Sequence, residues 1–200
     1  MLKQKGVVKV NDIKQSFSES VRHSVQSRNL DISSWAQEYV AGMLAVFVRS
    51  ANLFETSLNE KGSLEHFLQP IALSYLEAQN ADELRRIGDK CLFLTGFLYD
   101  FIRQQGMPQV RYYGDVGSSA YIDFAHSIGK EHRDAKQLYF ELARKFWDLS
   151  EIIHGIQSAE SYSSKTLLDI LFKYTQERDP RHYDLLLKNG FIINQAKEDN

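Results

Sequence analysis

The sequence contains few of the residues whose abundance marks special classes of protein. Its single cysteine, Cys91, cannot form a disulfide within the chain, which excludes a disulfide-rich secreted framework. Three prolines and eleven glycines in 200 residues exclude a collagen-like or low-complexity chain. The longest uncharged apolar run, from Cys91 to Tyr99, is about half of the ~20 residues that a membrane-spanning helix needs.

Neither sign of charge dominates the chain. Lys and Arg number 24 and Asp and Glu number 26, so the basic excess typical of nucleic-acid-binding proteins is missing. The first ten residues lack the apolar stretch of a secretory signal peptide, and their lysines indicate a solvated tail. From these absences we expect a soluble, cytoplasmic protein that binds neither nucleic acid nor a membrane.

Aromatic and apolar residues are plentiful by contrast. Twelve Phe, ten Tyr and two Trp, in a composition that is 43% hydrophobic, can supply a thick core. A length of 200 residues suits one domain. We therefore expect residues 1–10 to be a tail and residues 11–195 to form a single helical domain.

Residues 82–105 are predicted to be the buried central helix of that domain. Apolar side chains recur there at steps of three and four residues, which is typical of one face of an α-helix. The residues of this stripe are Leu84, Ile87, Cys91, Leu94, Leu98 and Phe101. Leu92, Phe93 and Phe97 add a second apolar face. A helix that is apolar on nearly all sides must be enclosed by protein.

Similar stripes and capping residues predict further helices on both sides of the central one. Their approximate ranges are 11–28, 33–49, 64–79, 110–128, 131–157, 163–177 and a short helix that ends near residue 190. The predicted stripe of the second helix is Trp35, Tyr39, Met43 and Val46, with Ser33 or Ser34 as its cap; Asp82 is the predicted cap of the central helix. Residues 51–63 are predicted to be a loop. The predicted fold class is all-α, a single-domain antiparallel bundle of about seven to eight helices.

Asp89 lies one turn into the apolar part of the central helix. If it is buried, its carboxylate must be paired or hydrogen-bonded. Arg85 and Arg86 precede it by four and three residues, so either can reach it along the helix. The candidate hydroxyl donors are Tyr112, Tyr113 and Tyr121. Two interpretations stay open: a polar network that fixes the core, and a polar pocket.

A second unusual segment, residues 114–120, places glycine, serine and alanine where a helix should run. Small residues let another group approach the backbone closely. That group is a neighbouring helix, a small ligand or a flat cofactor. The candidate ligand-binding residues are Asp89, Tyr112, Tyr113, Gly114, Asp115, Gly117, Tyr121 and His23.

The run from Arg111 to Asp115 resembles the distal-helix segment of haem oxygenases. That resemblance implies an all-helical haem protein in which Asp115 organises water near the iron-bound oxygen and His23 is the proximal iron ligand. Ser118 and Ser119 stand where those enzymes have paired glycines. Haem is the one cofactor that the sequence suggests, as an alternative to having none.

Two carboxylate–histidine pairs have the spacing of metal ligands on one helix face. These pairs are Asp123 with His126, and Glu151 with His154. They lie on consecutive predicted helices, whereas a di-iron bundle also needs carboxylates from two further helices. We therefore expect no metal site, and keep the four residues as weak candidates.

Two longer motifs resemble an uncharacterised bacterial family of all-helical proteins. The first is R-x-G-D-x-x-L-F-x-x-G-F, beginning at Arg86, and the second is Y-Y-x-x-x-G-x-x-A-Y, beginning at Tyr112. The resemblance covers about residues 12–193 and implies one domain, but it brings no reaction, cofactor or partner. It weighs against haem oxygenase, because the second motif overlaps the segment on which that resemblance rests.

No set of residues has both the types and the spacing that catalysis requires. The leading prediction is therefore a non-catalytic helical protein that binds a protein partner, unidentified, or a second copy of itself. The alternative is a small-ligand or haem-binding protein that uses residues 114–120. A carboxylate–histidine metal site is the third possibility.

Overall fold

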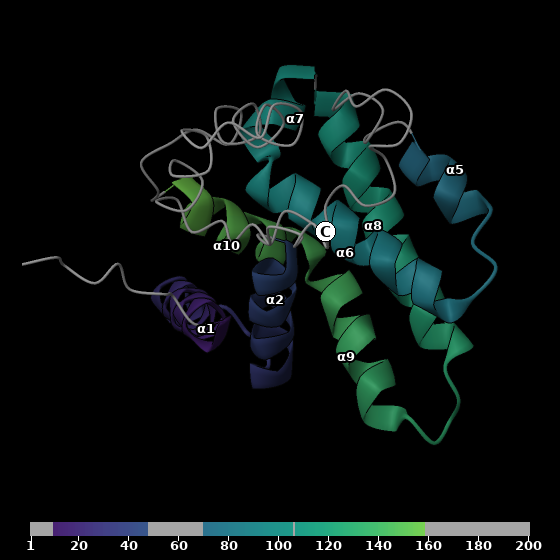
Figure 1. Ribbon diagram of the computed structural model, residues 1–200, viewed down its shortest axis with the longest axis horizontal. Coiled ribbons are helices and arrows are strands. Elements are labelled where there is room, and N and C mark those ends of the chain that lie inside the picture. The colour runs from purple at the N-terminus through teal and green to yellow at the C-terminus, as the bar shows by residue number, and fades with distance from the viewer. Residues whose placement is uncertain (1–9, 48–69, 106, 159–200) are drawn as a thin grey trace, which may run out of the picture.

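The computed structural model describes residues 10–47, 70–105 and 107–158, and every regular element in these ranges is an α-helix (Figure 1). This confirms the predicted all-α fold class. The helices are α1 (Val10–Ser27), α2 (Ser34–Phe47), α5 (Pro70–Leu76), α6 (Ala81–Phe97), α7 (Tyr99–Gln105), α8 (Met107–Ser127), α9 (Arg133–Arg144) and α10 (Phe146–Ser158). Predictions for residues 1–9, 48–69 and 159–200 lie outside the described residues.

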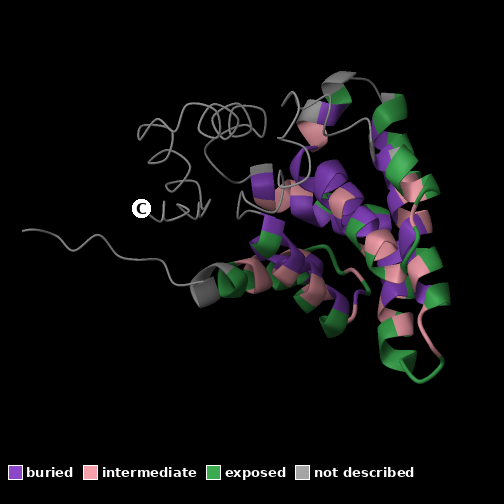
Figure 2. Ribbon diagram, turned by 45° about the vertical axis from the view of Figure 1, so that its right-hand side comes forward, coloured by how far each residue is buried: buried purple, intermediate pink, exposed green. Residues whose placement is uncertain are grey.

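Helix α6 runs through the middle of the molecule, where α8 and α10 pack along it (Figure 1). Residues 87–98 are all buried except the half-buried Lys90. Leu92, Phe93 and Leu94 are almost completely shielded from solvent, and Figure 2 shows the buried residues gathered around this helix. The predicted buried centre is confirmed. None of the helices in the described ranges combines the length and the apolar character needed to cross a membrane.

Asn80, rather than the predicted Asp82, caps the start of α6. The side-chain oxygen of Asn80 accepts a hydrogen bond of 3.0 Å from the backbone N–H of Glu83. The Glu83 carboxylate accepts in return from the Asn80 amide at 2.8 Å and from the backbone N–H of Gln79 at 2.8 Å. This reciprocal capping satisfies donors that the first turn of a helix cannot satisfy itself.

The start of α2 is fixed by a residue far along the chain. Ser33 is the cap, since its hydroxyl oxygen lies 3.2 Å from the backbone N–H of Ala36. Both the backbone N–H and the hydroxyl of Ser33 donate to the carboxylate of Glu141 on α9, at 2.7 and 2.6 Å. One of the two predicted caps is therefore confirmed, and the carboxylate ties α2 to α9.

The predicted stripe of α2 is wrong by part of a turn. Trp35 and Val46 are exposed, and Tyr39 is half-buried. The residues of α2 that face the core are Ala36, Val40, Ala41, Met43, Leu44, Ala45 and Phe47. This helix is apolar on so many sides that periodicity could not show which side turns inward.

The predicted central helix over 82–105 is two helices, because the chain breaks at Leu98 between α6 and α7. The Thr95 hydroxyl donates to the carbonyl of Cys91 at 2.9 Å, a bond that bends helices by competing for a backbone acceptor. At the next position, a side chain on Gly96 would meet Ile153 at 2.6 Å, so α10 presses directly on the backbone there. A serine- or threonine-glycine pair is a common place for a helix to bend.

The predicted helix over 131–157 is also two helices, α9 and α10, joined at Lys145. No glycine or proline stands at the junction. Leu142, Phe146 and Leu149 are all buried, so the apolar stripe continues through the break without interruption. Sequence periodicity therefore could not reveal a change of helix axis that keeps the same side inward.

Candidate functional site

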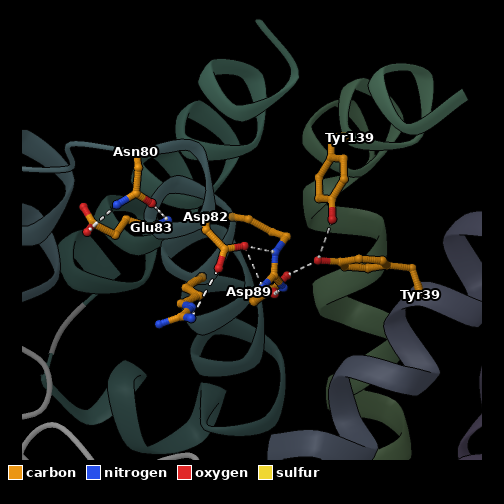
Figure 3. Close-up of polar contacts among 8 residues, drawn as sticks. Tyr39, Asn80, Asp82, Glu83, Asp89 and Tyr139 are labelled. Atoms are coloured by element: carbon orange, nitrogen blue, oxygen red, sulfur yellow. Dashed lines mark hydrogen bonds and ion pairs between the residues drawn. The ribbon is translucent and has the colours of Figure 1, made fainter. Parts of the chain in front are cut away.

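Asp89 is the centre of a buried hydrogen-bond network that joins four helices. Figure 3 shows the part of it that runs from Asp89 through Tyr39 to Tyr139. The Oδ1 of Asp89 accepts from the hydroxyls of Tyr39 on α2, at 2.7 Å, and Tyr121 on α8, at 2.8 Å. Its Oδ2 accepts from Arg85, one turn earlier on α6, at 3.1 Å. The hydroxyl of Tyr139 on α9 donates to the Tyr39 oxygen at 3.2 Å. Asp89 is 6% exposed, so the network lies inside the protein.

Burial sets the protonation behaviour of the groups in this network. Removal from water raises the pKa of Asp89 above its usual range, although the two tyrosine hydroxyls and the Arg85 guanidinium partly offset this rise. Burial, followed by the nearby Asp89 charge, likewise raises the pKa of Tyr121 and Tyr39. Both tyrosines therefore remain protonated and serve as permanent donors to the carboxyl group.

The structure confirms part of the predicted network. Arg85 pairs with Asp89, whereas Arg86 forms an ion pair of 3.3 Å with Asp82 instead. Among the three candidate donors only Tyr121 reaches Asp89; Tyr113 is buried elsewhere in the core and Tyr112 is exposed. Tyr39 and Tyr139 were missed, because both stand on helices whose position relative to α6 depends on tertiary packing. Both oxygens of the Asp89 carboxyl group accept hydrogen bonds from protein donors. This is typical of a polar network that fixes the packing of a core.

The small residues of α8 make room for neighbouring side chains. A Cβ on Gly114 would collide with the Trp147 ring, and one on Gly117 would stand 2.5 Å from Cys91 Cβ and 2.7 Å from the Phe146 ring. Ala120 is fully buried. This arrangement favours the helix-packing interpretation of residues 114–120.

The residues suggested for haem do not fit a haem site in this arrangement. The faces of Gly114 and Gly117 are covered by side chains of α6 and α10, so a flat cofactor has no room against them. His23 is an exposed residue of α1 and does not belong to the pocket that Asp115 lines.

A pocket of about 590 Å³ opens between α7, α8 and α10. The residues that line it are Tyr99, Val110, Arg111, Asp115, Trp147, Ser150, Glu151 and His154. Arg111 and Asp115 are one turn apart on α8, and the four residues of α10 follow each other at steps of three, one and three. Each helix therefore turns one continuous stripe toward the pocket. Of the predicted ligand-binding residues, Asp115 lies here.

His154, one of the residues that line this pocket, contains an unsatisfied polar atom. Its Nδ1 is buried and has no hydrogen-bond partner within the described ranges. The Tyr99 ring packs on the imidazole, with ring centroids 4.8 Å apart. Buried polar atoms almost always have a partner, so an orphan of this kind marks a place where water or another molecule belongs.

The candidate metal ligands do not come together. Asp123 accepts a hydrogen bond of 2.5 Å from Tyr75, and the His126 ring packs against Phe140 at 5.2 Å. Glu151 forms an ion pair of 3.5 Å with Arg28 at the end of α1. Across the residues that the structure describes, no cluster of three or more His, Cys, Asp or Glu side chains could hold a metal ion.

Comparisons with known proteins add no relative to these observations. No protein-family model, no curated protein and no solved structure matches the chain. The resemblances to the bacterial helical family and to haem oxygenases therefore stay predictions.

Proposed function

We propose that this protein binds a small organic molecule in the pocket between α7, α8 and α10. The observation that carries the proposal is a pocket of about 590 Å³ whose lining includes His154, a residue with a buried Nδ1 that has no partner in the described part of the chain. Pockets that bind small molecules are typically about 300–1,000 Å³ in volume and combine apolar walls with a few polar groups. Here Tyr99, Val110 and Trp147 are the apolar walls. We also propose that the protein is located in the cytoplasm. A free thiol such as that of the buried Cys91 stays reduced in that compartment.

Binding alone, without a chemical step, suits the polar residues of the pocket best. A nucleophilic serine needs a histidine within hydrogen-bond reach, and no such bond joins Ser150 to His154 among the contacts of the described residues. Glu151 is held in an ion pair with Arg28 on the protein surface. These side chains can therefore orient a ligand, and nothing in their arrangement activates one.

Ligand-observed NMR tests the proposal directly. The purified full chain would be mixed with a defined panel of small aromatic acids, amines, amides and amino acids, and saturation transfer to each compound measured. The Trp35→Phe variant leaves Trp147 as the only tryptophan, so its fluorescence reports on the pocket for every compound that binds. We expect at least one compound to show transfer and to change the Trp147 emission.

A pocket-filling variant supplies the control. Glu151→Trp places a large ring in the pocket from an exposed position, whereas Arg144→Trp adds the same ring on α9, away from the pocket. Binding should be lost in the first variant and retained in the second. Binding that survives Glu151→Trp, or a complete lack of binding by the panel to the wild-type protein, would contradict the proposal.

Protein interaction, the leading prediction from the sequence, is the second candidate. Trp35 is 76% exposed, although tryptophan is on average a highly buried residue in folded proteins. We propose a second copy of the chain as the partner to test first. Sedimentation analysis over a wide concentration range should show a dimer that Trp35→Ser weakens; a monomer at every concentration would count against self-association.

A further inference from the structure

Arg111 and Asp115 lie one turn apart on α8 and both line the pocket, yet they do not pair with each other. Side chains at this spacing have Cβ atoms about 5–6 Å apart and commonly form an ion pair. In the described part of the chain neither residue forms an ion pair or a side-chain hydrogen bond, although the exposed ion pairs of α6 do form. Among the described residues that line it, the pocket therefore presents one free cation and one free anion side by side.

From this juxtaposition we propose that the ligand is a zwitterion with an aromatic ring, of the class of the aromatic amino acids. The inference rests on the proposed function and names its ligand. The α-carboxylate pairs with the guanidinium of Arg111, and the α-ammonium pairs with the carboxylate of Asp115. An amino acid carries these two charges on one carbon, which matches opposite charges one helical turn apart.

The other charges at the pocket do not compete with the ligand for Arg111 or Asp115. Glu151 is the remaining carboxylate among the described residues of the lining, and its partner Arg28 approaches from α1 at 3.5 Å. In the described part of the lining, the Glu151 charge is thus already balanced by the protein. A ligand with a net charge of either sign would leave Arg111 or Asp115 without a counter-ion, whereas a zwitterion satisfies both.

The apolar walls favour a ring as the body of the ligand. The Trp147 ring is seated over Gly114 and makes an edge contact with Phe146 at 6.0 Å, so its orientation is fixed before a ligand arrives. Tyr99, on α7, is the other aromatic residue of the described lining, and its ring packs against His154. Preorganised aromatic walls bind a flat ring without ordering costs of their own. An ammonium group near the Trp147 face would also gain a cation–π contact.

Calorimetric titration with three related compounds tests the inference. Phenylalanine carries both charges, phenethylamine lacks the carboxylate, and 3-phenylpropionate lacks the ammonium group. Since hydrogen bonds to charged groups are the strong ones, each single-charge analogue should bind at least about tenfold more weakly than phenylalanine.

Charge-removing variants assign each charge to its residue. Arg111→Gln should weaken phenylalanine about tenfold but leave phenethylamine unchanged, because that compound has no carboxylate to lose. Asp115→Asn should weaken phenylalanine and leave 3-phenylpropionate unchanged. Arg144→Gln and Asp134→Asn, the same changes at exposed positions of α9, should alter no affinity.

The outcomes separate this inference from the proposed function. Equal affinity for the three compounds, or equal effects of Arg111→Gln on phenylalanine and phenethylamine, would overturn the zwitterion while the pocket remains a binding site. The same holds if the three compounds fail to bind and another member of the NMR panel binds at Trp147. Failure of every compound would overturn both.

Discussion

The ring of Tyr121 packs closely against Gly88, while its hydroxyl donates to the carboxyl group of Asp89, the next residue along α6. A Cβ on Gly88 would stand 2.5 Å from two carbons of that ring, and the hydroxyl bond is 2.8 Å long. Glycine and aspartate side by side therefore let one tyrosine make both a packing contact and a buried hydrogen bond. This explains why small and acidic residues interrupt an otherwise apolar helix.

Gly88→Ala should lower the free energy of unfolding by about 1–3 kcal/mol, because the added methyl forces the Tyr121 ring away and overpacks the core. Urea unfolding measures the effect. Gly42→Ala is the matched control, since among the described residues its Cβ would meet only the flexible end of Lys14, at 3.8 Å. There the gain in helix propensity should stabilise the protein by about 0.5–1 kcal/mol. Equal effects at the two positions would contradict this account of Gly88.

Removing single tyrosine hydroxyl groups should show how much each hydrogen bond of the Asp89 network contributes to stability. Tyr121→Phe leaves the buried Asp89 short of a donor and should cost about 1–3 kcal/mol in urea unfolding. Tyr139→Phe removes only the 3.2 Å bond to the Tyr39 hydroxyl and should cost about 0.5–1.5 kcal/mol. If Tyr139→Phe proves the more damaging change, Asp89 is not the centre of the network.

Relative to the Asp89→Asn variant, the wild-type protein should lose stability as the pH rises above the ordinary pKa of an aspartic acid. Burial raises the pKa of Asp89 in the folded protein. The unfolded chain therefore releases this proton at lower pH than the native state does, and unfolding becomes more favourable over that interval. Each unit of difference contributes about 1.4 kcal/mol. Urea unfolding of both proteins from pH 4 upward gives the free energy of unfolding of the wild type relative to that of Asp89→Asn. If this relative stability rises with pH, Arg85 and the tyrosines outweigh burial.

Much of this fold could be predicted from spacing alone. Leu92, Phe93 and Phe97 gave α6 apolar character on several sides, and all three are buried. The pairing of Asp89 with Arg85 could also be predicted, because residues four apart on a helix are neighbours regardless of what surrounds them. Such local relationships depend only on helix geometry.

The sequence could not predict which residues of different helices come together. Tyr39 reaches Asp89 from 50 positions away, and nothing local indicates that α2 crosses α6 there. The pocket shows the same limit. Arg111 and Trp147 stand on helices that the sequence predicts, but only the packing of α8 against α10 brings the two residues to one pocket. The break at Lys145 escaped prediction for a related reason, since the buried face is the same on both sides of it.

Gly117 should tolerate no larger residue, because α6 and α10 meet α8 at this point. A Cβ there would stand 2.5 Å from Cys91 Cβ on α6 and 2.7 Å from the Phe146 ring at the start of α10. Gly117→Leu should lower the free energy of unfolding by about 3 kcal/mol or more, near the upper end for overpacked cores. Thermal and urea unfolding measure the loss; unchanged stability would rule out the helix-packing interpretation of residues 114–120.

A double-mutant cycle with Phe146 identifies which neighbour resists the added side chain. Gly117→Ala and Phe146→Leu should each destabilise the protein, the first by overpacking and the second by leaving a cavity. Combined, they should cost less than their sum by about 0.5–3 kcal/mol, because the smaller side chain at 146 makes room for the methyl at 117. Strict additivity would place the conflict at Cys91 instead. Cys91→Ala cannot relieve that conflict, since the clashing atom is the Cβ that alanine retains.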